Sequence, residues 1–265
     1  MLHLFDLPLE ILVKITEFLP NKDILNLSIS SKYFLDLVFA VKFTDEVNFE
    51  SINKLPYFDS FTNVDFFNVT SQIVYPKFLR FLKWNTGQFL RKFPDLLESL
   101  EIKLYNQPIT QFPDSLKVLN IGYDYNQVIS RLPASLEVLK LSYPYNQVLP
   151  QLPNSLMVLE LSSNYNKQLP SLPDSITCLI LSDSETPISR FPNSLKRLEI
   201  GWYRSYMLPT IPDSLTELII GSSSIIRSFR MSRKKLALRK LSQLPKLSPN
   251  VVVKFYCSEK SLEIL

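Results

Sequence analysis

The chain has 265 residues, of which 46% are hydrophobic and 20% charged. This composition is typical of a soluble globular protein with a sizeable core, and it excludes a disordered chain. The formal net charge of +4 is too small to indicate a nucleic-acid partner by itself. The two cysteines, Cys178 and Cys257, cannot form a disulfide framework, so we expect a reducing compartment.

The first residues, 1–6, lack the basic segment that opens a signal peptide. Apolar runs such as 251–253 are far shorter than the roughly 20 residues that cross a bilayer. We therefore expect a cytoplasmic protein without a membrane partner, and the nucleus is a second location to consider.

Residues 1–42 show no internal repeat and predict three short helices. The first begins within 7–12, where Pro8 is acceptable in the first turn, and it ends before Pro20. Four of its apolar residues fall on one helical face: Ile11, Ile15, Phe18 and Leu19. Polar residues suited to capping precede the other two helices: Asn21, Asp23, Ser30 and Ser31.

Residues 43–75 separate these helices from a repeat that fills most of the remaining chain. We expect a connecting segment with one or two degenerate first units of that repeat, which fill the end of its core. The segment is rich in phenylalanine: Phe43, Phe49, Phe58, Phe61, Phe66 and Phe67.

Prolines recur at a fixed spacing after residue 75. Where the repeat is clearest they stand 19 or 20 residues apart, at Pro113, Pro133, Pro153, Pro173, Pro192 and Pro212. The unit reads [L/F]-P-x-S-L-x-x-L-x-[L/I]. A fixed period of about 20 residues is the signature of a solenoid, in which each unit buries its apolar face against its neighbours.

Within each unit, the apolar residues 6 and 8 positions after the proline alternate with variable residues, as Leu139 and Leu141 do after Pro133. This alternation predicts a short strand with one buried face, so that stacked units form a parallel sheet along one side. The proline restricts the return segment, for which we expect extended backbone or a single 3₁₀ turn.

The predicted fold class is therefore α/β. A short three-helix head at 1–42 and a connecting segment at 43–75 are followed by a solenoid of about 20-residue repeats at 76–265, with a parallel sheet on one face. A last strand at 254–257 is expected to cap the stack.

A polar column reads Tyr-Asn-Gln or Tyr-Asn-Lys in four units. Stacked asparagines can satisfy backbone groups where the chain leaves the strand, which makes the column architectural; the alternative is direct contact with a ligand. The units after Pro173 and Pro192 lack the asparagine, so the ladder should break there. The four asparagines are Asn106, Asn126, Asn146 and Asn166.

The strand positions that alternate with the buried ones line the open face of the sheet, which we expect to be concave. Val118, Val138 and Val158 form an apolar stripe there, and exposed stripes often mark interaction sites. The alternative is that these valines serve β propensity alone. Aromatic residues, which are favoured at interfaces, follow several strands: Tyr123, Tyr143 and Trp202.

The sequence contains few residues that could form a catalytic or metal site. The one histidine, His3, lies at the N-terminus, and with the two cysteines it cannot make a four-ligand zinc site. The four glycines stand singly, which excludes a glycine-rich phosphate loop. We therefore expect neither an enzyme nor a cofactor.

A basic segment at 227–246 interrupts the repeat near the C-terminus. It is either a surface helix or inserted loop, or else a nuclear localisation patch or a site for an acidic partner. Nucleic-acid binding through this segment is a third hypothesis, which the mild net charge does not favour.

The head resembles the F-box. The run L-P-x-E-I-L-x-x-I-x-x-F-L-x-x-x-D-x-L-x-L-S followed by S-K carries the resemblance, with a tyrosine or phenylalanine where the family has a large aromatic residue. In the family this module docks on the Skp-type adaptor of the SCF ubiquitin ligase, so the resemblance implies adaptor contacts at Leu7, Pro8, Ile11, Leu12 and Ile15. The alternative is a helical cap on the open end of the solenoid, and the intervening residues 43–75 argue against direct stacking.

The repeat resembles the FNIP repeat, a short leucine-rich-like repeat of social amoebae and giant amoebal viruses. The resemblance covers roughly 76–228, with tyrosine in place of the family's phenylalanine. Together the two resemblances imply a substrate-recruiting subunit of an SCF-type ligase, with a Skp-type adaptor, a cullin and an unknown target protein as partners. If the source is viral, the location is the host cytoplasm. The alternative is a protein-interaction scaffold with no ubiquitin link.

Overall fold

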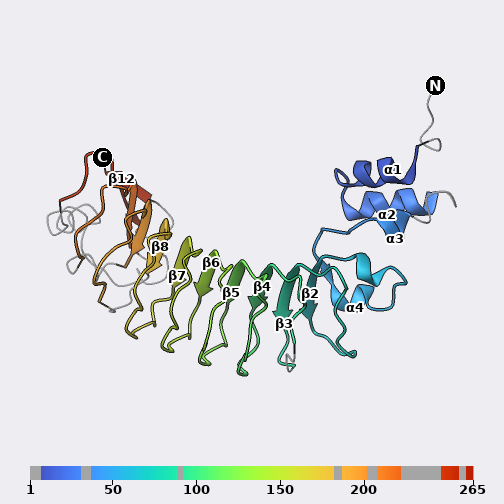
Figure 1. The fold of residues 1–265 in the computed structure, drawn as a ribbon, viewed down its shortest axis with the longest axis horizontal. Helices are drawn as coiled ribbons and strands as arrows, with labels where there is room; N and C mark the ends of the chain where they lie inside the picture. Colours follow the sequence, from blue (N-terminus) through green and yellow to red (C-terminus); the bar gives the residue numbers. More distant parts are fainter. Residues whose placement is uncertain are drawn as a thin grey trace.

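The computed structural model describes residues 7–30, 37–88, 92–181, 187–201, 208–221, 246–256 and 261–264. Within these ranges, twelve strands form one sheet in sequence order, and the stack curves into an arc with the strands on its inner side (Figure 1). The strands are β1 Val47–Asn48, β2 Asn63–Phe67, β3 Phe81–Asn85, β4 Ser99–Ile102, β5 Val118–Ile121, β6 Val138–Leu141, β7 Val158–Leu161, β8 Cys178–Leu181, β9 Arg197–Ile200, β10 Glu217–Ile220, β11 Val252–Tyr256 and β12 Ser261–Ile264. The predicted solenoid is confirmed.

The coils stack in register, so that each strand residue pairs with the equivalent residue of the next coil. Val118 pairs with Val138 and Val138 with Val158, and the pairing is parallel from β1 to β11. From β2 to β11, the strand positions that face the core are buried, as Leu139 and Leu141 are. The alternation read from the sequence therefore places the core correctly.

The proline of each unit begins a tight turn rather than a helix. In the coil of Pro113, the amide of Leu116 donates to the proline carbonyl over 3.1 Å. The unit's serine then bonds to the preceding coil: Ser135 Oγ donates to the carbonyl of Leu116 over 2.8 Å, and Ser155 Oγ to that of Leu136 over 2.7 Å. The serines of the P-x-S-L motif thus form a ladder of hydrogen bonds between successive coils, which the sequence pattern did not predict.

Four tyrosines form a stack inside the solenoid. Their ring centroids are 6.4 to 6.5 Å apart with interplanar angles of 2° to 11°, within the range of favourable aromatic pairs. Burial raises the pKa of Tyr145 above its usual value, so the phenol stays neutral. The members are Tyr105, Tyr125, Tyr145 and Tyr165, all at most 1% exposed.

The first coils have an aromatic core. Phe49 stacks on Phe66 at 4.5 Å, and Phe66 lies 5.5 Å from Trp84. The helix α4 Phe49–Ile52 and the 3₁₀ helix η3 Phe58–Ser60 belong to these coils. The degenerate units expected within 43–75 are therefore present as β1 and β2, and large rings fill the space that leucines fill further along.

The head contains α1 Leu9–Thr16, α2 Asn21–Ser30 and α3 Leu37–Ala40. Pro8 is the N-cap of α1 rather than part of its first turn. The start of α2 is capped from a distance: the Asn21 amide donates to Asp45 Oδ2 over 2.7 Å. The sequence suggested Asn21 or Asp23 as the cap, but the acceptor is Asp45, which follows α3 in the sequence.

The head packs through α3 on the connecting segment, whose coils begin the solenoid. Buried Val38 on α3 has its carbonyl 3.4 Å from Ser60 Oγ, and Phe43 stacks on Phe61 at 4.8 Å. The bridge between Phe43 and Phe61 begins the sheet before β1. The contact arises because the chain after α3 enters the first coil without a linker.

The C-terminal end also differs from expectation. The strand β11, which contains the predicted 254–256, is not the last strand, because β12 pairs with it in antiparallel direction. A hairpin partner needs only a short connection, whereas a further parallel strand needs a complete coil. Residue 257 of the predicted strand, and the basic segment up to residue 245, lie outside the described residues.

Replacement of Tyr145 by Ala should lower the free energy of unfolding by about 3 to 5 kcal/mol, because it leaves a ring-sized cavity between two stacked neighbours. The matched control is Tyr123→Ala, whose ring is 70% exposed, and it should change stability by less than about 0.5 kcal/mol. Urea unfolding measures both values. Equal effects of the two variants would contradict a packed tyrosine stack.

Glu50 on α4 fixes the turn after β2. Its carboxylate accepts the amides of Ser71 and Thr70, over 2.9 and 2.5 Å, and these bonds lower its pKa from 4.5 to about 2. A depressed pKa contributes stability that is complete above the unfolded value and lost as pH falls through the folded value. The melting temperatures of the wild type and Glu50→Gln should therefore differ most near neutral pH and converge as pH falls from 4.5 to about 2. A difference independent of pH would contradict this role.

Candidate functional site

The helix α1 has an exposed apolar face. Ile11 is 41% exposed, Ile15 37% and Phe18 86%, whereas Leu12 and Thr16 on the other side are almost fully buried. Ile11 and Ile15, four residues apart, lie on one face of the helix. Phe18 lies in the turn after α1, where its amide donates to the carbonyl of Ile15 over 3.2 Å, and we call these three exposed side chains the strip of α1. A folded domain gains nothing by presenting such a strip to water, and strips of this kind mark binding surfaces.

The structure divides the five residues that the resemblance assigned to adaptor contact. Ile11 and Ile15 lie on the exposed strip, and Pro8 is exposed at the start of α1. Leu7 is half-buried against the core. Leu12 is 2% exposed, so it holds the head together from inside. Leu9 and Phe18 are also exposed but were not among the residues assigned to adaptor contact, although the sequence already placed Phe18 beside Ile11 and Ile15.

The inner face of the solenoid brings the predicted valines together. Val118, Val138 and Val158 are consecutive partners in the sheet, and Cys178 continues the column. Each of them is half-exposed rather than fully exposed. Burial raises the pKa of the Cys178 thiol, so it remains protonated and continues the stripe as an apolar group.

The predicted aromatic residues lie at the strand exits. Tyr123 follows β5 and is 70% exposed, and Tyr143 follows β6 and is 55% exposed. Trp202 lies outside the described residues. Sequence reasoning missed Val128 and Val148, which are 61% and 64% exposed just after the Tyr-Asn-Gln motifs. The sequence could have indicated them, because the position after the Tyr-Asn-Gln or Tyr-Asn-Lys motif is valine in these two units and Pro108 or Gln168 in the other two.

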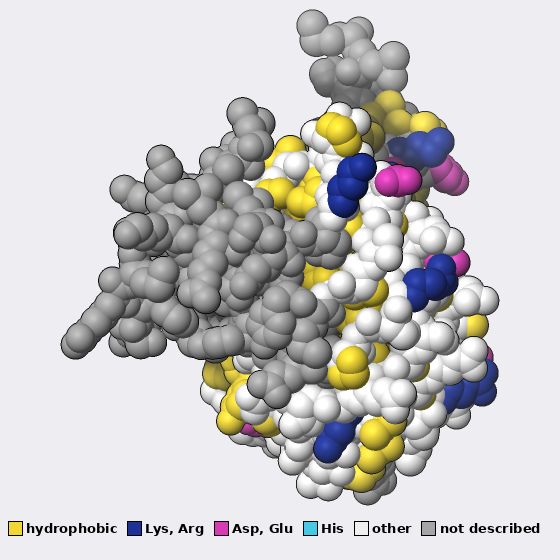
Figure 2. Space-filling model, turned by 90° about the vertical axis from the view of Figure 1, so that its left-hand side faces the viewer, with side chains coloured by type: hydrophobic (Ala, Val, Ile, Leu, Met, Phe, Trp, Pro, Cys, Tyr) yellow, Lys and Arg dark blue, Asp and Glu magenta, His cyan; other side chains and the backbone are white. Residues whose placement is uncertain are grey.

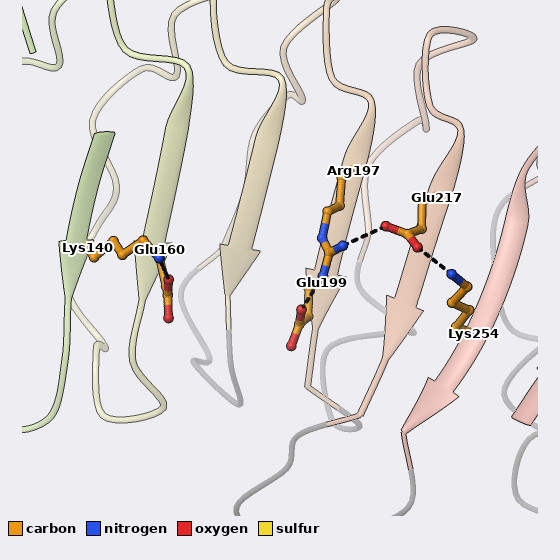
Figure 3. Close-up of polar contacts among 6 residues, drawn as sticks. All are labelled: Lys140, Glu160, Arg197, Glu199, Glu217 and Lys254. Atoms are coloured by element: carbon orange, nitrogen blue, oxygen red, sulfur yellow. Dashed lines mark hydrogen bonds and ion pairs between the residues drawn. The ribbon is translucent and has the colours of Figure 1, made fainter. Parts of the chain in front are cut away.

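Charged side chains form a row on the same inner face (Figure 3). Lys140 Nζ lies 3.3 Å from Glu160 Oε2, and Lys254 Nζ lies 2.8 Å from Glu217 Oε1. Arg197 connects two carboxylates, with Nη1 2.9 Å from Glu217 and Nη2 3.4 Å from Glu199. The sequence showed these residues in the right columns but not their pairing, which depends on rotamers across neighbouring strands.

The two carboxylates that Arg197 contacts differ in their pKa. The hydrogen bond from Lys254 is the main cause that lowers the pKa of Glu217. Burial raises the pKa of Glu199 and outweighs the opposing effect of Arg197. The single cation in contact with Glu199, Arg197, thus does not offset the effect of burial on the pKa of this carboxylate.

The asparagine column is the predicted ladder. Asn106 Oδ1 accepts the amide of Asn126 over 2.9 Å, Asn126 Oδ1 that of Asn146 over 2.9 Å, and Asn146 Oδ1 that of Asn166 over 3.1 Å. These bonds support the architectural interpretation. The residues at 182–186, where the ladder was expected to break, lie outside the described residues.

Other kinds of site find little support in the described part of the chain. Its cysteine, aspartate and glutamate side chains form no cluster that could hold a metal ion. Among its helices, none has the length and hydropathy to cross a membrane. Seen from the C-terminal end, the described surface carries separate basic and acidic side chains rather than one broad basic patch (Figure 2).

The fold and its two surfaces define a class: a repeat solenoid with a helical head, an architecture typical of non-catalytic interaction modules. Comparison with family models makes the class specific. The F-box domain matches residues 4–46, and the FNIP Repeat matches residues 105–144 and 145–184. The head thus matches the F-box domain, and two central coils of the solenoid match the FNIP Repeat.

Comparison with curated proteins gives no match. Among solved structures, YopM from Yersinia enterocolitica WA-314 is similar, with 20% sequence identity and a TM-score of 0.35. The similarity covers 75% of this chain and 50% of that chain, so this chain matches about half the length of YopM.

Replacement of Asn126 by Ala tests whether the ladder is architectural. The change removes the acceptor of the Asn146 amide, and the free energy of unfolding should fall by about 1 to 3 kcal/mol. The control Asn126→Asp keeps an acceptor oxygen in place and should recover most of that loss. Thermal or urea unfolding of the three proteins gives the comparison. Unchanged stability in Asn126→Ala would instead favour a role in ligand contact.

Proposed function

We propose that the protein is the substrate-recruiting subunit of an SCF-type ubiquitin ligase. In this proposal the head binds a Skp-type adaptor and, through it, a cullin, while the inner face of the solenoid binds the target protein. The F-box match and the FNIP repeats support the division of labour between the two parts. The transfer of ubiquitin would belong to other subunits, and the complex would act in the cytoplasm.

The exposed strip on α1 is the observation that carries the proposal. The head places Leu12 and Thr16 inward and leaves Ile11, Ile15 and Phe18 outward. Burying an isoleucine or phenylalanine side chain in an interface stabilises a complex by about 1.5 to 3 kcal/mol before the costs of association. A strip of this size therefore suits a stable contact with the apolar groove of a partner.

The strip and the inner face lie on different parts of the molecule. The head stands at the N-terminal end of the arc, and the strands line its inner side (Figure 1). A protein bound to α1 therefore does not need the surface that the valine stripe offers to a target. This arrangement is what a bridging subunit requires.

The test is a pull-down of the purified chain with a Skp-type adaptor. The double variant Ile11→Glu with Ile15→Glu should weaken binding by about thirtyfold or more, because it places two charges in the centre of an apolar contact. Since both side chains are exposed, the variant should remain folded. Circular dichroism checks this point.

A matched control makes the same chemical change elsewhere. Val128→Glu with Val148→Glu alters two valines of the solenoid that are more exposed than either isoleucine, and adaptor binding should persist. Absence of binding in the wild type would remove the ubiquitin link and leave a protein-interaction scaffold.

A further inference from the structure

The charged row on the inner face alternates in sign except at one strand. From β9 onward the order is Glu199, Arg197, Glu217 and Lys254, and each neighbouring pair is in contact. On the other side of β8, Lys140 pairs with Glu160. Two carboxylates therefore lie on either side of β8, with no cation between them on that strand (Figure 3).

The sheet register fixes how close the two carboxylates can come. Glu160 pairs with Ile180, and Ile180 pairs with Glu199. Neighbouring strands are about 4.8 Å apart, so the two glutamates leave the backbone about 10 Å from each other. Glu217 shows that a carboxylate in this row can contact cations on both sides, since it binds Arg197 and Lys254. In the described part of the chain, Glu160 and Glu199 each pair with a single cation.

The negative charge of Glu160 reaches Glu199 across β8. Burial is the main cause of the raised pKa of Glu199, and the negative charges of Glu160 and Glu217 raise it further against the effect of Arg197. A cation placed over β8 would reduce this repulsion. Like charges that remain close without a counter-charge between them favour a partner that supplies one.

The floor between the carboxylates is apolar. Cys178 and Ile180 are the two residues of β8 that face the inner side, and both are half-exposed. Each of the other strands from β6 to β11 carries at least one charged side chain at these positions, such as Lys140 on β6 and Arg197 on β9. We call the site formed by Glu160, Cys178, Ile180 and Glu199 the β8 slot.

We propose that the β8 slot binds a lysine or arginine side chain of the protein partner. Its aliphatic stem lies over Cys178 and Ile180, and its charged head lies between Glu160 and Glu199. Long basic side chains cover apolar surface with their stems while their heads reach polar partners, which matches the floor and walls of the slot. The inference rests on the proposed use of the inner face for target binding, and it adds the chemistry of the residue that the target presents.

The experiment selects short peptides from a displayed random library on the intact chain. Peptides with a basic residue beside apolar ones should be enriched. Their binding should weaken about tenfold in Ile180→Lys, which supplies the missing cation from β8 itself, and in Glu160→Gln with Glu199→Gln. The matched control is Glu101→Gln, in the same column on β4, and it should leave binding unchanged.

Recovery of peptides without basic residues, or binding that ignores Ile180→Lys, would overturn the proposal. A second measurement needs no partner: the pKa of Glu199, followed by NMR, should fall in Ile180→Lys and remain raised in Ile180→Leu. An unchanged value in the lysine variant would mean that a cation over β8 does not reach Glu199. Since the adaptor pull-down depends on α1 alone, failure of the ubiquitin link and failure of the β8 slot give different results.

Discussion

Parallel hydrogen bonding between equivalent residues of successive coils is the constraint on which the whole structure depends. Because Val118 pairs with Val138 and then with Val158, each side chain of the unit lies beside its own copy. Copies of leucine therefore merge into one core and copies of tyrosine into one stack. Copies of asparagine and serine form continuous ladders for the same reason. A shift of one residue between two coils would break all of these arrangements together.

The two ends of the stack need separate solutions, since a regular coil always exposes the next sheet edge. At the N-terminal end, aromatic coils and α3 cover the core, with Phe43 and Val38 in contact with the first turns. At the C-terminal end, β12 reverses direction and pairs with β11. The head thus has a structural role at this end of the stack beside any binding role.

The period of the sequence was enough to predict most of the solenoid. Proline spacing located the coils, and the alternation around Leu139 and Leu141 located the strands and their buried faces. These features repeat, so each copy strengthens the inference. The asparagine column was predicted for the same reason.

Features that occur once could not be read in this way. Asp45 caps a helix that begins 24 residues earlier, and nothing local to either residue indicates the pair. The side of α1 that faces outward was ambiguous, because apolar residues lie on both faces and only the position of α3 decides that Leu12 is inside. The row through Arg197 depends on rotamer choices between strands, which residue type alone does not specify.

The strict register also sets fixed distances along the solenoid. The distance along the arc from β1 to β8 is a whole number of strand spacings, and each coil adds about 4.8 Å. Gain or loss of one unit of about 20 residues would shift a partner bound on the inner face by one strand spacing relative to the head. The contacts between neighbouring coils would stay the same. Repeat number is therefore a means of adjusting reach in fixed steps, without a new fold or a new interface.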